Sequence, residues 1–186
     1  MLDRISNQMA QMANNRYLVA IRDGLISTLP LIMVGSFFMI LAFPPLPEHW
    51  PIMDWVAANR GTILLPFRAT MFIMTLYAVI GIGSSLAKQY EMDPTSGAII
   101  ATVGFMLTLT ATTADGLGWV LPMTNLGSQG MFFGIIVAIF SVEVLRFCKS
   151  RNLIFKMPDG VPPSVARSFE AIIPTTIVVI AVLHIL

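Results

Sequence analysis

Charged side chains are scarce in this sequence. Only 11% of its 186 residues are Asp, Glu, Lys or Arg, whereas soluble domains carry about a quarter. Hydrophobic residues make up 56%, and the mean hydropathy is +0.79. The net charge is only +1, so no strong positive field attracts polyanions. These values exclude a soluble globular domain, a disordered tail and a nucleic-acid-binding protein, and they indicate an integral membrane protein.

Cysteine and histidine are also rare. The single cysteine, Cys148, excludes an internal disulfide framework and a cysteine-based zinc cluster. The two histidines, His49 and His184, are far apart in the sequence. Neither a glycine-rich phosphate loop nor an H-E-x-x-H motif is present. We therefore expect no metal, no cofactor and no catalytic residue within this chain.

Long apolar runs, by contrast, are frequent. A hydrocarbon core about 30 Å thick needs roughly 20 apolar residues in a helix. Five stretches approach this length, and they predict an all-α membrane protein with transmembrane helices near residues 24–43, 69–87, 96–113, 130–147 and 171–186. The last stretch has only 16 residues and runs to the final residue. We expect a piece of a longer protein, and a short span that just reaches the far interface is the alternative.

The two flanks of these spans differ in positive charge. Cytoplasmic flanks of membrane proteins are enriched in lysine and arginine. The flank that contains the N-terminus carries nine of the eleven cations, namely Arg4, Arg16, Arg22, Lys88, Arg146, Lys149, Arg151, Lys156 and Arg167. The other flank carries Arg60 and Arg68. This asymmetry predicts a cytoplasmic N-terminus.

Three segments outside the spans have patterns of their own. Apolar residues recur at spacings of three and four within 1–17, which predicts an amphipathic helix lying in the cytoplasmic interface. The connection 44–62 combines prolines with Trp50 and Trp55, and it is typical of a short interfacial element anchored by aromatic rings. The glycine-containing segment 115–119 predicts a turn or a re-entrant hairpin at the outer surface.

Polar side chains within the spans are few. Glu143 and Arg146 are three residues apart, and this spacing predicts an ion pair on one helix face near the membrane edge. Their alternative role is in a substrate pathway. Cys148 stands at the C-terminal end of its predicted helix, where the helix dipole disfavours a thiolate, so a structural role is favoured. His184 is isolated near an interface, which favours a packed or solvated histidine.

Small residues recur at helical spacing on several predicted spans. This pattern lets helices approach closely in lipid. We expect helix packing at these positions, while a role in dimerisation stays open because the partner helix cannot be read from the sequence. The residues concerned are Gly130, Gly134 and Ala138, then Gly81 with Ser85, and Gly83 with Ala87.

The connection 156–170 contains several residues that restrict the backbone. Pro158, Gly160, Pro162 and Pro163 predict a constrained turn, and a new helix that contains Glu170 is expected to begin at Pro163 or one residue later. A structured linker between two helices is one interpretation. A surface that faces a substrate or a partner domain is the other.

Three stretches together resemble a known family. Residues 15–30 (NRYLVAIRDGLISTLP), 34–38 (VGSFF) and 157–169 (MPDGVPPSVARSF) are similar to the membrane component, enzyme IIC, of bacterial phosphotransferase sugar permeases in the lactose, cellobiose and chitobiose group. The resemblance implies a homodimer in the bacterial inner membrane. It also implies an N-terminal half that provides most of the dimer contact and a C-terminal half that holds the sugar. A cytoplasmic enzyme IIB, charged by enzyme IIA, then phosphorylates the sugar.

The resemblance also limits the site. The histidine and glutamate of the family that contact the sugar belong to the C-terminal half, and no position here matches them. The resemblance implies that the connection after the fourth span lies close to the sugar pocket or to enzyme IIB. The candidates for shaping this region are Asp159, Gly160, Val161, Pro162, Pro163 and Ser168. The leading hypothesis is the scaffold half, 18–186, of a disaccharide permease. The alternatives are a membrane module that only dimerises and, more remotely, an ion-coupled carrier.

Overall fold

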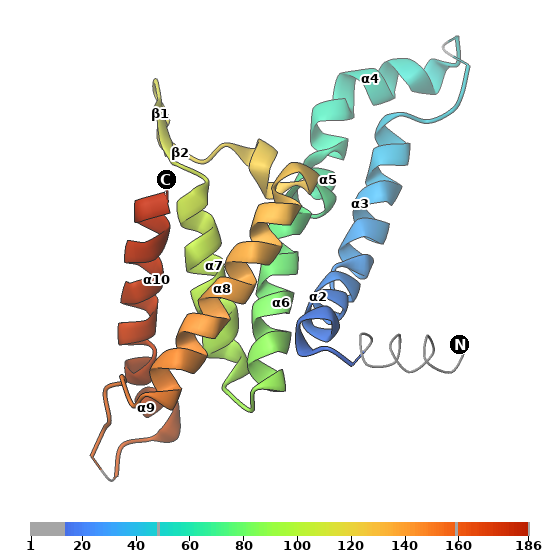
Figure 1. The fold of residues 1–186 in the computed structure, drawn as a ribbon. Coiled ribbons are helices and arrows are strands. Elements are labelled where there is room, and N and C mark those ends of the chain that lie inside the picture. Colours follow the sequence, from blue (N-terminus) through green and yellow to red (C-terminus); the bar gives the residue numbers. More distant parts are fainter. Residues whose placement is uncertain (1–13, 48, 159, 186) are drawn as a thin grey trace, which may run out of the picture.

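The computed structural model describes residues 14–47, 49–158 and 160–185, and it is a bundle of helices with one short hairpin (Figure 1). The amphipathic helix expected over 1–17 lies mostly outside the described residues. The first described helix, α2 (Arg16–Ile26), begins after Asn15, whose side chain accepts a hydrogen bond from the Tyr17 N–H. This N-cap fixes the start of the helix. Arg16 and Tyr17 therefore belong to α2 and not to the interfacial element.

The first membrane-length segment is a broken helix. It comprises α2 and α3 (Leu29–Ala42), so it spans Arg16–Ala42 and begins before the expected residue 24. The break falls where the Ser27 and Thr28 hydroxyls donate to the carbonyls of Gly24 and Leu25, 2.6 and 2.7 Å away. Pro30 follows and has no N–H to continue the ladder. The run 24–43 contains no charged residue, and this absence alone did not reveal the break.

An arm begins with the second half of the first segment. We use this term for α3, α4 (Pro51–Ile63) and α5 (Leu65–Ala69), which extend away from the rest of the molecule (Figure 1). Pro51 and Pro66 occupy the first turns of α4 and α5, where a missing N–H costs nothing. Trp50, which precedes α4, and Trp55, which lies within it, are both exposed in the predicted interfacial segment 44–62.

Three helices form the centre of the bundle. They are α6 (Met74–Gln89), preceded by the 3₁₀ turn η1 (Met71–Ile73), α7 (Pro94–Thr108) and α8 (Met131–Ser150). We call α6, α7 and α8 the central block. Its buried core includes Val79, Ile82, Ala101, Phe105 and Ala138. Helix α2 packs against α6 on one side of the block, and α10 (Ile172–Ile185) packs against α7 and α8 on the other.

The expected span 96–113 is wrong at its C-terminal end. Helix α7 stops at Thr108, and at 15 residues it is shorter than the four membrane-length helices among the described residues. Thr110 adopts a positive φ of 41°, and strand β1 (Thr112–Ala114) then pairs antiparallel with β2 (Gly118–Val120). Gly116 lies in the turn and Gly118 begins β2, with positive φ of 77° and 74°. The β-branched threonines favour the extended chain over a helix.

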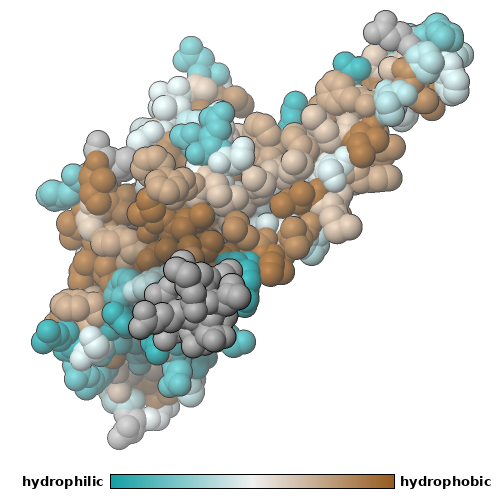
Figure 2. Space-filling model, turned by 45° about the vertical axis from the view of Figure 1, so that its right-hand side comes forward, coloured by the Kyte–Doolittle hydropathy of each residue, from teal (hydrophilic) through white to brown (hydrophobic). Residues whose placement is uncertain are grey.

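The remaining elements lead to the last span. Two 3₁₀ turns, η2 (Met123–Leu126) and η3 (Ser128–Gly130), connect the hairpin to α8. A loop then reaches α9 (Pro163–Glu170), which begins at the predicted proline and continues into α10. Figure 2 shows hydrophobic residues in a broad band across the body of the molecule, with hydrophilic residues gathered below it. The four membrane-length helices and this band fit an integral membrane protein.

Candidate functional site: the groove beside α9

The loop before α9 ends in backbone conformations that favour glycine and proline. Gly160 has a φ of 103°, and Pro162 is extended before Pro163 opens the helix. Gly160, Pro162, Pro163 and Ser168 are exposed, and Val161 is half-buried. The remaining candidate from the sequence, Asp159, lies outside the described residues. The predicted turn and helix start are therefore present, on a surface open to a ligand or partner.

Two ion pairs connect α9 to the central block. Arg167 Nε lies 3.6 Å from Asp93 Oδ1 at the start of α7, and Lys149 Nζ at the end of α8 lies 3.1 Å from Glu170 Oε2. The four side chains are between one-fifth and one-half exposed, so each pair contributes at most about 1 kcal/mol. Because the pairs reach two different helices, they fix the position of α9 across the end of the block.

Asp93 has a second role as the N-cap of α7. Its Oδ2 accepts hydrogen bonds from the backbone N–H and the hydroxyl of Ser96, at 2.7 and 2.8 Å. Burial alone would raise the pKa of this carboxyl, but the Ser96 bonds and the nearby Arg167 and Lys149 charges outweigh it and lower the pKa. Asp93 therefore stays ionised and holds both a helix start and α9. The sequence Asp-Pro-Thr-Ser carries this capping signal, although sequence reasoning did not use it.

A groove runs between α7 and the α9–α10 segment. Its volume is about 730 Å³, and its wall combines the Asp93–Arg167 pair with hydroxyl groups and with apolar side chains. Of the predicted loop residues, Ser168 lines this groove, while the segment Gly160–Pro163 precedes it. The lining is Asp93, Thr95, Ser96, Arg167, Ser168, Thr175 and Thr176 on the polar side, with Ile99, Ile100, Ala171, Ile172 and Val179 as the apolar part.

The chemistry of the groove suits polar contact more than catalysis. Thr175 and Thr176 donate to main-chain carbonyls of their own helix, so their oxygens remain as acceptors toward the groove. Within the described ranges, no group of three or more His, Cys, Asp or Glu side chains is placed to hold a metal ion. Cys148 is buried and His184 is exposed, in agreement with the roles favoured from the sequence.

A second polar cluster joins α2, α6 and α8 at the same end of the molecule. Glu143 accepts hydrogen bonds from the Tyr90 and Tyr17 hydroxyls, at 2.5 and 3.1 Å, and pairs with Arg146 at 2.9 Å. Arg16 and Arg146 lie over the Tyr90 ring, 5.3 and 4.6 Å from its centroid. Burial and the hydrogen bonds with Glu143 and Tyr17 raise the pKa of Tyr90. The Glu143–Arg146 pair was predicted, and the two tyrosines were missed because their contacts span distant residues.

The small residues singled out in the sequence face neighbouring helices of the same chain. A Cβ on Gly81 would lie 2.9 Å from Gly24 Cα in α2, and one on Gly134 would lie 2.8 Å from Thr75 Cγ2 in α6. Ser85 donates to Asp23 at 3.4 Å. Gly130 faces the Asn125 carbonyl, and Ala138 is fully buried. Gly81 and Gly134 therefore lie where helices of this chain approach closely. The part of the small residues in dimerisation stays a prediction.

The comparison with known proteins adds to this geometry. The profile of a family described as "Phosphotransferase system, EIIC" matches residues 22–186. The chain belongs to this EIIC family. The cellobiose-specific EIIC component of Geobacillus stearothermophilus is 36% identical over 97% of the chain and 42% of its own length. The lichenan permease IIC component of Bacillus subtilis is 39% identical over 88% of the chain and 39% of its own length.

A solved EIIC structure has the same fold. The transporter ChbC, the IIC component of an N,N'-diacetylchitobiose-specific phosphotransferase system, superposes with a TM-score of 0.87 at 36% identity. The match covers 97% of this chain and 44% of ChbC. The chain thus spans less than half the length of the EIIC relatives that it matches, and the resemblance found in the sequence is confirmed at the level of the family.

Proposed function

We propose that the chain is part of a sugar permease of the phosphoenolpyruvate-dependent phosphotransferase system that carries a disaccharide of the cellobiose, chitobiose or lactose class inward. The single observation that carries this proposal is the EIIC match over residues 22–186, since it covers most of the chain. The ChbC fold and the named sugars of the relatives support the substrate class. Enzymes IIB and IIA are the partners that a phosphotransferase system requires.

The division of labour is part of the same proposal. In it, residues 18–186 are the scaffold and dimer-forming half, and the sugar-binding half lies in the remainder of the permease. The partial coverage of the relatives supports this division. A membrane module that dimerises without transport is the alternative, and membership of a transporter family favours the permease.

The α9 loop and the groove beside it are the parts of this chain proposed to act closest to the sugar or to enzyme IIB. The support is the combination of an exposed, constrained loop, a hydroxyl-lined groove and fixed anchoring by two ion pairs. Hydroxyl and carboxylate oxygens are suited to the many donors of a sugar. The family histidine and glutamate have no counterpart here, so we assign no catalytic role to this chain.

The α9 end of the molecule is proposed to face the cytoplasm. Of the cations among the described residues, Arg60 and Arg68 lie in the arm and the others lie toward α9. A matched pair of cysteines tests this orientation in a Cys148→Ser background. We expect a membrane-impermeant maleimide to label Asn59→Cys in intact cells and Lys156→Cys only after permeabilisation. The reverse pattern would refute the orientation.

Uptake of radiolabelled cellobiose tests the transport function. Cells that express the intact gene product should accumulate labelled sugar phosphate, and cells that lack the cognate enzyme IIB should not. Equal accumulation in both strains would contradict the proposal. In the same assay, Gly160→Val and Gly116→Val each place a side chain at a positive φ, which costs about 1–2 kcal/mol. If the α9 loop acts in transport, only the first substitution lowers uptake.

A further inference from the structure

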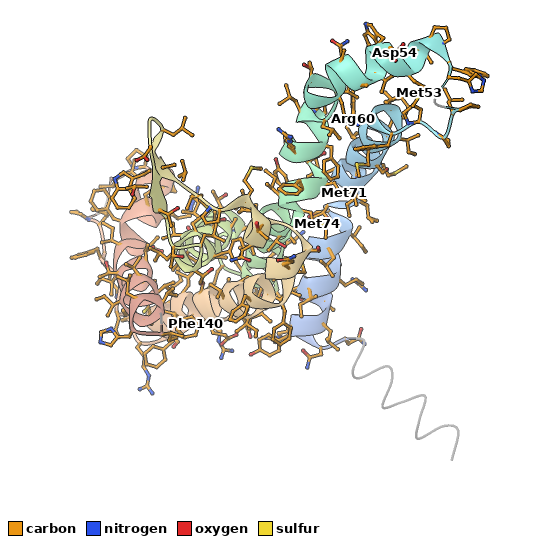
Figure 3. All side chains as sticks on the ribbon, turned by 90° about the horizontal axis from the view of Figure 1, so that it is seen from above. Met53, Asp54, Arg60, Met71, Met74 and Phe140 are labelled. Carbon is orange, nitrogen blue, oxygen red and sulfur yellow. The ribbon has the colours of Figure 1, made fainter. Side chains whose placement is uncertain are left out.

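All three tryptophans of the chain lie at the end of the molecule opposite α9. Trp50 precedes α4, Trp55 lies within α4, and Trp119 lies in β2. Figure 1 shows α4 and the hairpin rising from the same end of the bundle, and Figure 3, seen from above, shows them well apart. An indole ring has an apolar body and one N–H donor, and it prefers the boundary between headgroups and acyl chains. The α4 region and the hairpin thus both carry residues typical of the membrane interface at the same end of the molecule.

The hairpin exposes its largest apolar side chains. Leu117 is 78% exposed and Trp119 is 77% exposed. The register pairs Trp119 with Thr113, and both residues face outward. Each strand has only three residues, and a two-stranded hairpin of this size is marginally stable in water. We call Leu117 and Trp119 the hairpin tip. An apolar environment around the hairpin tip would shield its apolar side chains from water and would stabilise the short hairpin.

The surroundings of the hairpin favour lipid as that environment. Figures 1 and 3 both place the hairpin beside the last turns of α10. There Leu183 and Ile185 are 57% and 80% exposed on a membrane-length helix, so the apolar surface of a span continues into the hairpin. Asp115 is the one charged residue between Asp93 and Glu143 in the sequence, which leaves the hairpin without a cation to select anionic headgroups.

We propose that the hairpin tip is a membrane-contact element that lies in the headgroup region of the leaflet at the α4 end. Trp119 and Leu117 enter the boundary with the acyl chains, and the polar turn at Asp115 and Gly116 stays toward water. Together with Trp50 before α4 and Trp55 within it, this places interfacial anchors on opposite sides of the bundle. The anchors restrain its tilt. The proposal does not depend on the sugar or on the partner enzymes.

Fluorescence quenching in vesicles tests the proposal. The Trp50→Phe/Trp55→Phe variant leaves Trp119 as the single tryptophan of the chain, and the Trp50→Phe/Trp119→Phe variant leaves Trp55 as its matched control. In phosphatidylcholine vesicles, bromines placed near the glycerol backbone should quench Trp119 about twofold more than bromines near the acyl terminus. The quenching of Trp119 should be the same in vesicles that also contain phosphatidylglycerol, an anionic lipid.

Three results would overturn the proposal. Strong quenching by aqueous iodide without quenching by brominated lipid would place the hairpin tip in water. Protection from iodide that disappears when the protein is diluted into excess lipid would show that a second copy covers the tip. As an independent check on folded protein, a spin label on Leu117→Cys in a Cys148→Ser background should collide more often with oxygen than with a water-soluble nickel chelate. The opposite preference would also refute lipid contact.

Discussion

The central block and the arm each contribute to helices of membrane length, but their helices are held in different ways. In the block, Gly83 and Gly97 bring α6 and α7 so close that a Cβ on Gly97 would lie 2.5 Å from the Gly83 carbonyl oxygen. In the arm, Gly61 has no atom within 4 Å of its would-be Cβ, and Met33 is 72% exposed. A high mean hydropathy therefore identifies a membrane segment, whereas small residues that face a neighbouring helix identify where two helices are in contact.

The same contrast extends to polar contacts. The block ends in hydrogen bonds and ion pairs that connect separate helices, such as those of Asp93 and Glu143. In the arm, Arg60 Nε donates to the Ala42 carbonyl at 3.2 Å with its guanidinium over Phe43, and the Ala69 carbonyl accepts a hydrogen bond from the Tyr77 hydroxyl of α6 at 2.9 Å. Matched substitutions in the two regions should therefore lower the free energy of unfolding by different amounts. The size of each difference measures how much more the contacts of the block contribute to stability than those of the arm.

The largest difference is expected for leucine at two glycines. Gly134→Leu in α8 would force a side chain against Thr75 and Val79, whose nearest carbons are 2.8 and 2.9 Å from the would-be Cβ. Thr75 has little freedom to move because its hydroxyl donates to the Gly127 carbonyl at 2.6 Å. We expect a loss of about 3 kcal/mol, at the upper end of the range for overpacking, measured by thermal unfolding in detergent.

Gly61→Leu on α4 is the control for this prediction. The position is open and exposed, and leucine has a higher helix propensity than glycine, so stability should stay within about 1 kcal/mol of the parent. An unchanged melting temperature for Gly134→Leu would mean that α6 and α8 can separate freely. A change in oligomeric state at unchanged melting would instead assign this face to dimerisation.

Asp93→Ala should have the next largest effect. It removes an N-cap, worth about 0.5–2 kcal/mol, and the ion pair with Arg167, worth up to about 1 kcal/mol. We expect a loss of about 2 kcal/mol at neutral pH. Asp54→Ala is the matched control, because Asp54 stands exposed in the first turn of α4 and contributes mainly through the helix dipole, about 0.3–1 kcal/mol.

The pH dependence sharpens the Asp93 prediction. The pKa of Asp93 is lower in the folded protein than in the unfolded chain, so its stabilisation is present above the ordinary pKa of about 4 and is lost as the pH falls through the lowered value. The parent should therefore lose more stability than Asp93→Ala on acidification from about pH 5 downward. Parallel pH profiles for the two proteins would show that the ionised carboxyl is not what stabilises the start of α7.

The sequence predicted local features of the molecule better than features that join distant residues. The four membrane-length helices, the Pro163 helix start and the Glu143–Arg146 pair follow from neighbouring residues, and these were predicted. The interfacial position of the segment with Trp50 stays a prediction. The β-hairpin was foreseen only as a turn or re-entrant segment, and the threonines of 96–113 were wrongly kept in a helix. Threonine is β-branched and favours extended backbone, and the glycine-containing turn lets the two short strands pair.

Features that join distant residues were the ones that sequence reasoning could not supply. Tyr17 and Glu143 are 126 positions apart, and no pattern in the chain connects them. The same holds for Asp93 and Arg167, although each residue alone carried a signal as a cap or a cation. The groove beside α9 lies where the Asp93–Arg167 pair joins α7 and α9. Ser168 was named from the family resemblance, and no local pattern indicated that it faces this groove.

The smallest difference is expected for the removal of one hydroxyl. Tyr90→Phe deletes the donor to Glu143 at 2.5 Å, and Tyr77→Phe deletes the donor to the Ala69 carbonyl of α5 at 2.9 Å. Glu143 keeps Arg146 and Tyr17 as partners, so we expect a loss of about 1 kcal/mol for Tyr90→Phe and about 0.5 kcal/mol for Tyr77→Phe.

A double substitution separates this cluster from a simple sum of contacts. If Tyr17 and Tyr90 share Glu143 as one network, the loss for Tyr17→Phe/Tyr90→Phe should exceed the sum of the single losses, because Glu143 then keeps only Arg146 among these partners. Thermal unfolding of the four proteins measures this coupling. Additive losses, or equal losses for Tyr90→Phe and Tyr77→Phe, would mean that the cluster joins α2, α6 and α8 no more firmly than the arm is joined to α6. The contrast between the two regions would then reduce to their glycines.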